Sequence, residues 1–313
     1  MLSVILKRVL ISIPLLLITS LITFLLLALL PGDPARAIVG VQGTPEDYER
    51  VREQLHLNEP LWQQFSSYVG GLLRGDLGSS LYTGESVSQM LGSRLPVTLS
   101  IIIGATLVGA VVGIVLGVLS ARYGGALGRT VDVVSLMGLA LPNFWLALLL
   151  VTLFAVTVPL FPATGYVPLD VSPDLWLASI TLPVIALAVG SVASISKITR
   201  DGVADALEQD YIRTLRSAGV SETSLLWKHA LKNAGVPVVT VVGLSFLGAL
   251  AGSLFVEAVF VLPGLGALVN DATTRQDIPV IQGIALAYAV IVVIVNLLVD
   301  ISYAYLNPKV RTA

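Results

Sequence analysis

The chain alternates between long apolar runs and shorter polar segments, and the apolar runs are long enough to cross a bilayer. A membrane span needs about 20 consecutive, mostly apolar residues. Six runs meet this length: Val9–Leu30, Pro96–Ser120, Val131–Val158, Leu175–Ser196, Val236–Val261 and Val280–Leu306. None alternates with a period of two, so each predicts a helix rather than a barrel strand. We expect an all-α membrane protein with six transmembrane helices in a single transmembrane domain, residues 1–313.

Composition agrees with this pattern. Hydrophobic residues make up 55% of the 313 residues and charged residues 12%, with a mean hydropathy of +0.89, outside the range of soluble domains. The first apolar run, about 22 residues, exceeds the 7–15 residues of a signal-peptide core, so we expect it to remain as a helix. The chain has no cysteine, which excludes disulfides and thiolate metal ligands. We expect no metal site, no catalytic residue and no nucleic-acid partner.

Lysine and arginine predict the orientation. With the N-terminus in the cytoplasm, the inward segments carry twelve of the eighteen basic residues. The short outward segment 159–174 has none and 262–279 has only Arg275. This asymmetry follows the positive-inside rule, so both termini are expected in the cytoplasm.

The first loop, residues 31–95, is expected on the extracytoplasmic side. It opens with PGDP and continues into an acidic stretch in which Thr44 precedes Pro45, Glu46 and Asp47. A hydroxyl residue followed by proline and acidic residues is a typical helix start. Two interpretations remain open for this loop: a lid packed on the outer mouth of the bundle, or a contact with a partner that delivers a substrate.

A charged island, QDYIRTLRSAGVSETSLLWKHALKNAGVP, lies between two apolar runs and covers most of the inner loop 198–235. Asp210 is expected to cap a helix that continues through Ala218 and ends at Gly219. Ser221 is expected to cap a second helix, and Pro237 to lie in the first turn of the next span. Such helices between two spans can pass the push of a soluble partner to both spans, or can simply anchor the loop in lipid headgroups.

Helical spacing predicts the faces of these two helices. In the first, Ile212 and Leu215 fall on one face and Arg213 and Arg216 on another. In the second, the residues expected to stack one above another are Leu226, Ala230 and Asn233.

The island resembles the conserved loop of the membrane subunits of binding-protein-dependent ABC importers, summarised as E-A-A-x-x-x-G with a later proline. Further motifs extend the resemblance to the dipeptide and oligopeptide branch, in its B-type permease subunit. They are LLPGDPARAIVG, GDLGSSLYTGESVSQMLGSRLPVTLSI, LPNFWLALLL, FVEAVFVLPGLGALVNDAT and VNLLVDISYAYLNPKVR. They are long, occur in order and cover nearly the whole chain.

The resemblance implies a type I ABC importer permease fold in a bacterial plasma (inner) membrane, and a division of labour. An extracytoplasmic binding protein would deliver short peptides, a second homologous permease would complete the pore, and two ATP-binding subunits would drive transport. ATP and Mg would then be bound by those subunits and no cofactor by this chain. In agreement, none of the five lysines follows a glycine, as a Walker A phosphate loop requires. Nickel, glutathione or another small solute remains an alternative cargo.

The resemblance also assigns the residues that would couple the chain to the ATPases. They are Asp210, Tyr211, Arg213, Thr214, Leu215, Arg216, Gly219, His229, Asn233 and Pro237. The chain departs from the pattern, because Arg213, Thr214 and Leu215 stand in the places of Glu-Ala-Ala, and Ala218 stands where a basic residue is common. We therefore expect a partner surface particular to this system.

A gradient-driven carrier is the rival class, and it usually needs ionisable groups deep in the membrane. The candidates Asp132, Glu257 and Asp300 fall near predicted helix ends, where hydrogen bonds between helices, and for Asp300 a pairing with Asn296 one turn earlier, are the expected role. A hydrolase is disfavoured because His56 and His229 flank the membrane on opposite sides and no H-E-x-x-H or G-x-S-x-G motif occurs.

Small and polar residues in the spans predict packing and a pathway. Gly109, Gly113 and Gly117 recur every four residues, as do Gly248 and Gly252, which favours close helix contacts, either static or sliding. Pro142 predicts a kink in the third span. The candidates for lining the pathway are Asn143, Thr240, Ser245 and Ser253.

Overall fold

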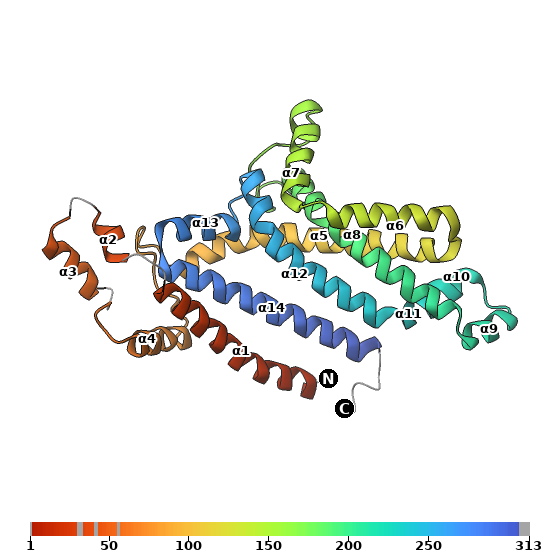
Figure 1. Cartoon of the computed structure of the whole chain (residues 1–313), viewed down its shortest axis with the longest axis horizontal. Coiled ribbons are helices and arrows are strands. Elements are labelled where there is room, and N and C mark those ends of the chain that lie inside the picture. The colour runs from red at the N-terminus through yellow and green to blue at the C-terminus, as the bar shows by residue number, and fades with distance from the viewer. Residues whose placement is uncertain (1, 30–33, 41–42, 55–56, 307–313) are drawn as a thin grey trace. The chain divides into compact units, whose positions relative to one another are not determined.

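A computed structural model describes residues 2–29, 34–40, 43–54 and 57–306, nearly all of them in helices (Figure 1). The long helices are α1 (Leu2–Ala28), α5 (Val87–Tyr123), α8 (Pro173–Leu207), α12 (Gly235–Phe260) and α14 (Ile278–Leu306). The helices of intermediate length are α3 (Pro45–Gln54), α4 (Leu61–Leu73), α6 (Gly125–Ala140), α7 (Asn143–Val151) and α13 (Leu265–Arg275). The short segments are α2 (Pro34–Val39), α9 (Asp210–Ser217), α10 (Glu222–Ser224), α11 (Leu231–Asn233) and the π-helical η1 (Thr152–Thr157) and η2 (Leu225–Ala230).

Among the described residues, five helices are long and apolar enough to cross a membrane, and a sixth candidate is a broken pair. The all-α class and the five unbroken spans are confirmed, but the helices extend beyond the apolar runs. Helix α5 begins at Val87 instead of Pro96, and α8 ends at Leu207 instead of Ser196. Helix α8 continues through charged residues past Ser196, so the hydrophobic run gives the length of the span but not that of the helix.

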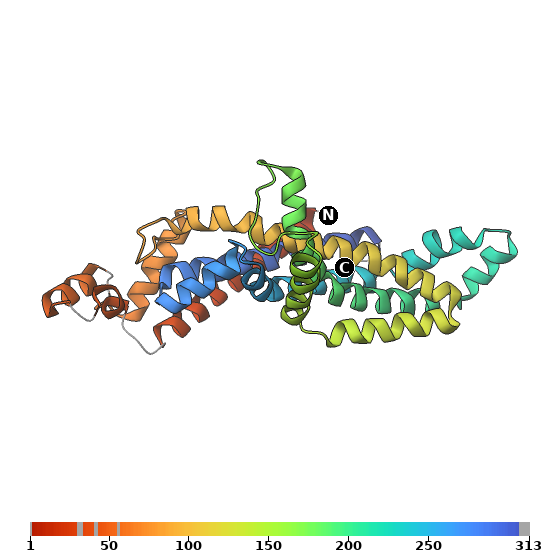
Figure 2. The same ribbon diagram turned by 90° about the horizontal axis from the view of Figure 1, so that it is seen from above.

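The predicted third span is not one helix. Helix α6 ends at Ala140, α7 begins at Asn143, and the two axes are bent by 97° (Figures 1 and 2). Pro142 has an extended backbone and serves as the N-cap of α7, so the kink expected at this proline is a complete break. The pair is either a broken span or a re-entrant segment.

The chain divides into two compact units. The first contains the start of α1 up to Ile5, residues 97–263 and α14 from Ile294 onward, and the second contains 6–96 together with 264–293. The expectation of one domain, residues 1–313, stays a prediction.

Within the first unit, glycines of α5 pack closely against α8. A Cβ atom at Gly109 would lie 2.7 Å from Cβ of Ser191, and one at Gly117 would lie 2.6 Å from the carbonyl oxygen of Ser196. The predicted glycine contacts of this span are therefore confirmed. In α12 the result is divided: Gly252 lies against Asn143 and Leu187, whereas no atom would lie within 4 Å of a Cβ at Gly248, so the prediction for Gly248 is wrong.

In the second unit, the predicted helix start at Thr44 is confirmed. The Thr44 hydroxyl accepts from the Asp47 amide at 3.2 Å, and α3 begins at Pro45. Helix α4 packs on α1, with the ring centroids of Phe65 and Phe24 5.4 Å apart. The loop thus folds against a span, but its role as a lid or a partner contact stays a prediction.

Candidate functional site

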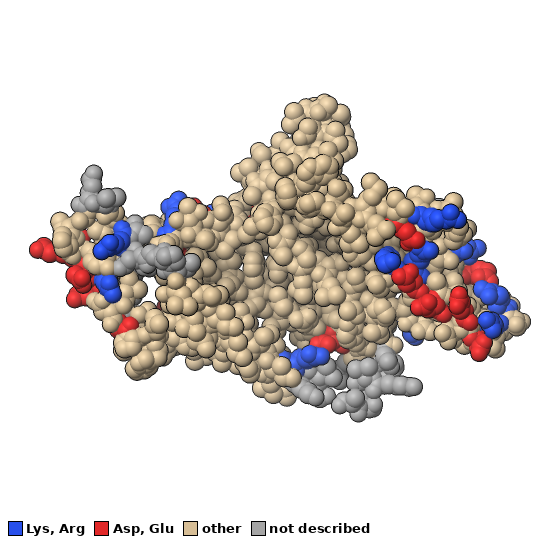
Figure 3. Space-filling view, viewed as in Figure 1, with Lys and Arg blue, Asp and Glu red and all other residues tan. Residues whose placement is uncertain are grey.

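The charged island folds as a hairpin of two helices between α8 and α12. Figure 3 shows charged side chains of the first unit gathered where α9 and α10 lie. Helix α9 begins at Asp210, but its N-cap is Gln209 and no side chain caps it. The prediction that Asp210 caps this helix is therefore wrong by one position. Asp210 lies in the first turn, where its charge complements the helix dipole, and it pairs with Arg213 at 3.3 Å.

The turn between the helices forms as expected. Gly219 has φ of +82°, the Gly219 amide donates to the Arg216 carbonyl, and the Val220 amide donates to the Leu215 carbonyl at 3.1 Å. This is the helix ending that a glycine in the left-handed region allows. The Ser221 hydroxyl then accepts from the Ser224 amide at 3.4 Å, which confirms Ser221 as the second cap.

The second helix contains a π-helical turn, η2, that the sequence did not predict. Leu226 and Ala230 are buried, but Asn233 is exposed and donates to the Tyr211 hydroxyl at 3.1 Å. The expected stack of the three residues is therefore only partly right, because the wider π turn rotates the following residues. Asn233 and Tyr211 instead join the two helices at the base of the hairpin.

The hairpin rests on a shared apolar core. Leu226 and Ala230 pack with Val118 of α5, Val203 of α8 and Val238 of α12. Of the predicted faces, Ile212 is fully buried and Leu215 half-buried, while Arg213 and Arg216 are exposed. A force on the hairpin can therefore reach three long helices through packed side chains.

The remaining residues assigned to coupling lie on the outside of this core. Thr214 is exposed and its hydroxyl donates to the Asp210 carbonyl at 3.1 Å. His229 is half-buried in η2, and Pro237 is exposed as the third residue of α12. His56 lies outside the described residues.

An ion pair between Arg216 and Glu222, which we call the clasp, joins the two helices across the turn of the hairpin. The sequence did not predict it. Arg216 donates to both carboxylate oxygens of Glu222, with Nε–Oε1 at 2.6 Å and Nη2–Oε2 at 3.2 Å. The bidentate geometry makes this stronger than an ordinary surface pair. The bond to Arg216 lowers the pKa of Glu222 and raises the pKa of Arg216.

Because the pKa of Glu222 is lower in the folded hairpin, the clasp stabilises the fold above the carboxyl's ordinary pKa and is lost as pH falls through the folded value. We expect Glu222→Arg to loosen the turn of the hairpin and Glu222→Arg with Arg216→Glu to restore it. The rate at which chymotrypsin cleaves the hairpin of the purified chain measures this effect. Arg213→Glu is the matched control, since its pair with Asp210 lies within one helix. An unrestored double variant contradicts the clasp.

The candidate pathway residues do not share one environment. Ser253 is fully buried and donates to the Leu250 carbonyl, and Thr240 lies 2.7 Å from the Tyr303 hydroxyl. Asn143 and Ser245 are half-buried. The side-chain amide of Asn143 lies against Gly252, where a Cβ atom would meet it. Their role in a pathway stays a prediction.

Of the ionisable groups, two form contacts between helices. Glu257 is fully buried in α12 and accepts from the Thr98 hydroxyl of α5 at 2.6 Å. Asp132 of α6 forms an ion pair with Arg200 of α8. The expected structural role is confirmed for both residues, and the partner of Glu257, Thr98, could not be found from sequence because 159 positions separate them. The expected pairing of Asn296 with Asp300 stays a prediction.

Long apolar helices, with a polar helical hairpin between two of them, are the features expected of the membrane subunit of a transporter. The description "Binding-protein-dependent transport system inner membrane component" matches residues 113–312, and the description of the N-terminal part of the same components matches residues 1–102. The chain belongs to this family, as the motifs predicted, and is a multi-pass permease of the inner membrane in an ABC importer.

Full-length relatives agree. A putative peptide transport system permease of Brucella abortus is 44% identical over 99% of both chains. The glutathione transport system permease protein GsiC of Salmonella typhimurium is 40% identical over 99% of both. Among solved structures, an inward-facing MetNI methionine ABC transporter chain matches 70% of this chain and 97% of its own length, with a TM-score of 0.55 and 17% identity. That match supports the type I permease fold alone.

Proposed function

We propose that this chain forms half of the pore of an ATP-driven importer of short peptides. A second homologous permease forms the other half, an extracytoplasmic binding protein delivers the substrate, and two ATP-binding subunits or domains hold ATP and Mg. The observation that supports peptides as the cargo is the 44% identity, over the full length, to a chain named as a peptide transport permease. This chain itself binds no cofactor in this proposal.

The structure of the hairpin supports the proposed transfer of energy from the ATPase subunits to the membrane spans. Its exposed first helix carries Arg213 and Thr214, and its second helix packs on α5, α8 and α12. A soluble ATPase that moves the hairpin therefore moves three spans through contacts that already exist. In this proposal the hairpin and both termini lie in the cytoplasm, as the distribution of lysine and arginine favours.

Glutathione is a second candidate cargo, favoured by the 40% identity to GsiC. Both cargoes carry peptide bonds and free carboxylates, so the binding protein would select between them. Uptake of a labelled dipeptide, with unlabelled oligopeptide or glutathione as competitor, separates the two.

Affinity purification of the tagged chain from native membranes tests the assembly. We expect two ATPase subunits or domains and a second permease to accompany the intact chain. Replacing 209–233 with a neutral linker should remove the ATPases but not the second permease. Replacing 45–54, the exposed α3, is the matched control and should keep both. An intact chain that purifies alone would overturn the proposal and leave a gradient-driven carrier.

A further inference from the structure

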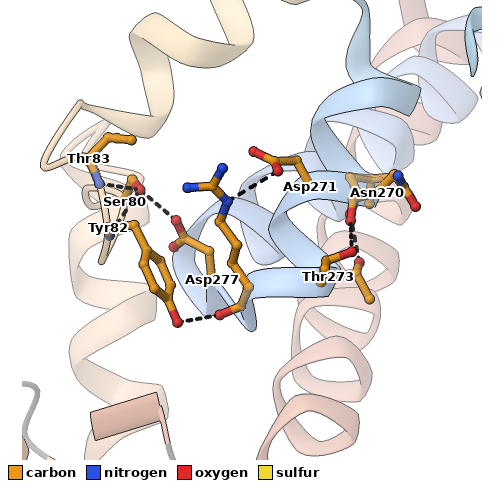
Figure 4. A network of polar contacts seen from close by, with 10 residues as sticks. Ser80, Tyr82, Thr83, Asn270, Asp271, Thr273 and Asp277 are labelled. Carbon is orange, nitrogen blue, oxygen red and sulfur yellow. Dashed lines mark hydrogen bonds and ion pairs between the residues drawn. The ribbon is translucent and has the colours of Figure 1, made fainter. Parts of the chain in front are cut away.

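A polar staple joins two segments of the second unit that are nearly 200 positions apart. The Ser80 hydroxyl donates to Oδ2 of Asp277 at 2.5 Å, and the Leu81 amide donates to Oδ1 at 3.2 Å. Beside them, the Tyr82 hydroxyl donates to the Arg275 carbonyl at 2.5 Å (Figure 4). The first segment precedes α5, and the second is the turn between α13 and α14.

We call residues Gly75–Ser86 the strap. It is a preformed loop: Gly75, Gly78 and Gly84 have positive φ, and the Ser80 amide donates to the Glu85 carbonyl at 2.9 Å. The Ser80 hydroxyl also accepts from the amides of Tyr82 and Thr83, at 3.3 and 3.1 Å. Ser80 therefore organises the strap and fixes it to Asp277 with the same oxygen.

The staple formed by Ser80 and Asp277 is buried. Asp277 is 4% exposed and Ser80 is 5% exposed. Next to it, Val87 at the start of α5 packs with Leu268 of α13 and Ile284 of α14 in one apolar cluster. Opening the contact would leave a buried carboxylate without two of its donors and would expose that cluster, which is costly.

The two ends that the staple joins are the beginnings of spans. Helix α5 starts at Val87, directly after the strap, and α14 starts at Ile278, directly after Asp277. Both beginnings face the extracytoplasmic side in the proposed orientation. If the bond between Ser80 and Asp277 stays closed, it ties the outer end of α5 to the outer end of α14.

We propose that Asp277 is a positioning residue that keeps the strap stapled to the α13–α14 turn throughout the transport cycle. The outer ends of α5 and α14 then move as one body, and the outer opening for substrate forms elsewhere. This inference rests on the proposed function, because it concerns the cycle of an ATP-driven permease.

The chain has no cysteine, so a Ser80→Cys, Asp277→Cys pair can be cross-linked without background in the assembled transporter. A direct disulfide has strict geometry, so a short bifunctional thiosulfonate is the reagent. The readouts are ATP hydrolysis stimulated by the binding protein and uptake of a labelled dipeptide. Tyr82→Phe, which removes only the neighbouring hydroxyl bond, serves as a milder companion variant.

We expect the free double variant to lose about tenfold in stimulated hydrolysis, since hydrogen bonds to a buried carboxylate are lost. Cross-linking should restore it to within about twofold of the unmodified chain, and reducing the link should remove the gain. Activity that falls further on cross-linking, or a free double variant as active as the unmodified chain, would overturn the inference.

Failure of the proposed function would be distinguished from failure of the staple. If the unmodified complex shows neither stimulated hydrolysis nor peptide uptake, the importer proposal fails. The extent of cross-linking, measured by mass spectrometry on the full chain in lipid, then decides whether the strap stays on the turn. A pair that links slowly and incompletely overturns the staple.

Discussion

Gly219→Glu is expected to abolish uptake and substrate-stimulated ATP hydrolysis while the chain still inserts into the membrane. Gly219 has φ of +82°, and no atom would lie within 4 Å of a Cβ there. The loss therefore comes from the backbone and not from a clash. A side chain in this region costs about 1–2 kcal/mol, and escaping it breaks the bond from the Val220 amide to the Leu215 carbonyl. Hydrolysis by the purified complex measures the effect.

Two further substitutions at this position distinguish an effect on the backbone of the turn from an effect on the exposed surface of the hairpin. Asparagine tolerates left-handed φ better than other side chains, so Gly219→Asn should keep most of the hydrolysis, whereas Gly219→Val should behave like the glutamate variant. If valine and asparagine act alike, the turn geometry is not the cause. Normal uptake by Gly219→Glu would remove the coupling assignment altogether.

The hairpin shows which parts of a site can be predicted from sequence. Gly219 and Ser221 act on backbone groups within a few positions, so their roles follow from residue type alone. The clasp of Arg216 with Glu222 crosses a turn, and it depends on how tightly Gly219 closes that turn. The π-helical turn at 225–230 has no sequence signal, since its effect is a shift of register seen only once Leu226 and Ala230 are packed.

The spans show the same limit. Apolar runs predicted six spans because lipid requires both length and hydrophobicity, and five of the six are unbroken helices. They did not predict that α8 continues to Leu207, since a charged helical extension outside the lipid has no hydropathy signal. Nor did they predict the full break at Pro142, which depends on how α7 packs. The staple of Ser80 on Asp277 is a contact across 197 positions, and no local pattern predicts such a pair.

Gly117→Ala is expected to separate α5 from α8 and to destabilise the first unit. Its Cβ would lie 2.6 Å from the Ser196 carbonyl oxygen and 2.6 Å from Cβ of Thr199. Both atoms belong to buried residues, and the carbonyl is part of the α8 backbone, so neither can turn aside. The helices must move apart along a glycine-lined contact, which overpacking data place at about 1–3 kcal/mol.

Thermal unfolding of the purified chain in detergent measures this loss, and Gly92→Ala is the matched control. Gly92 lies in the same helix, but no atom would lie within 4 Å of a Cβ there, and alanine favours a helix over glycine by about 1 kcal/mol. The control should therefore unfold at the same temperature or higher, and Gly117→Ala several degrees lower. Equal unfolding midpoints for the two variants would contradict a fixed contact. The glycines of α5 would then slide along α8 during the transport cycle.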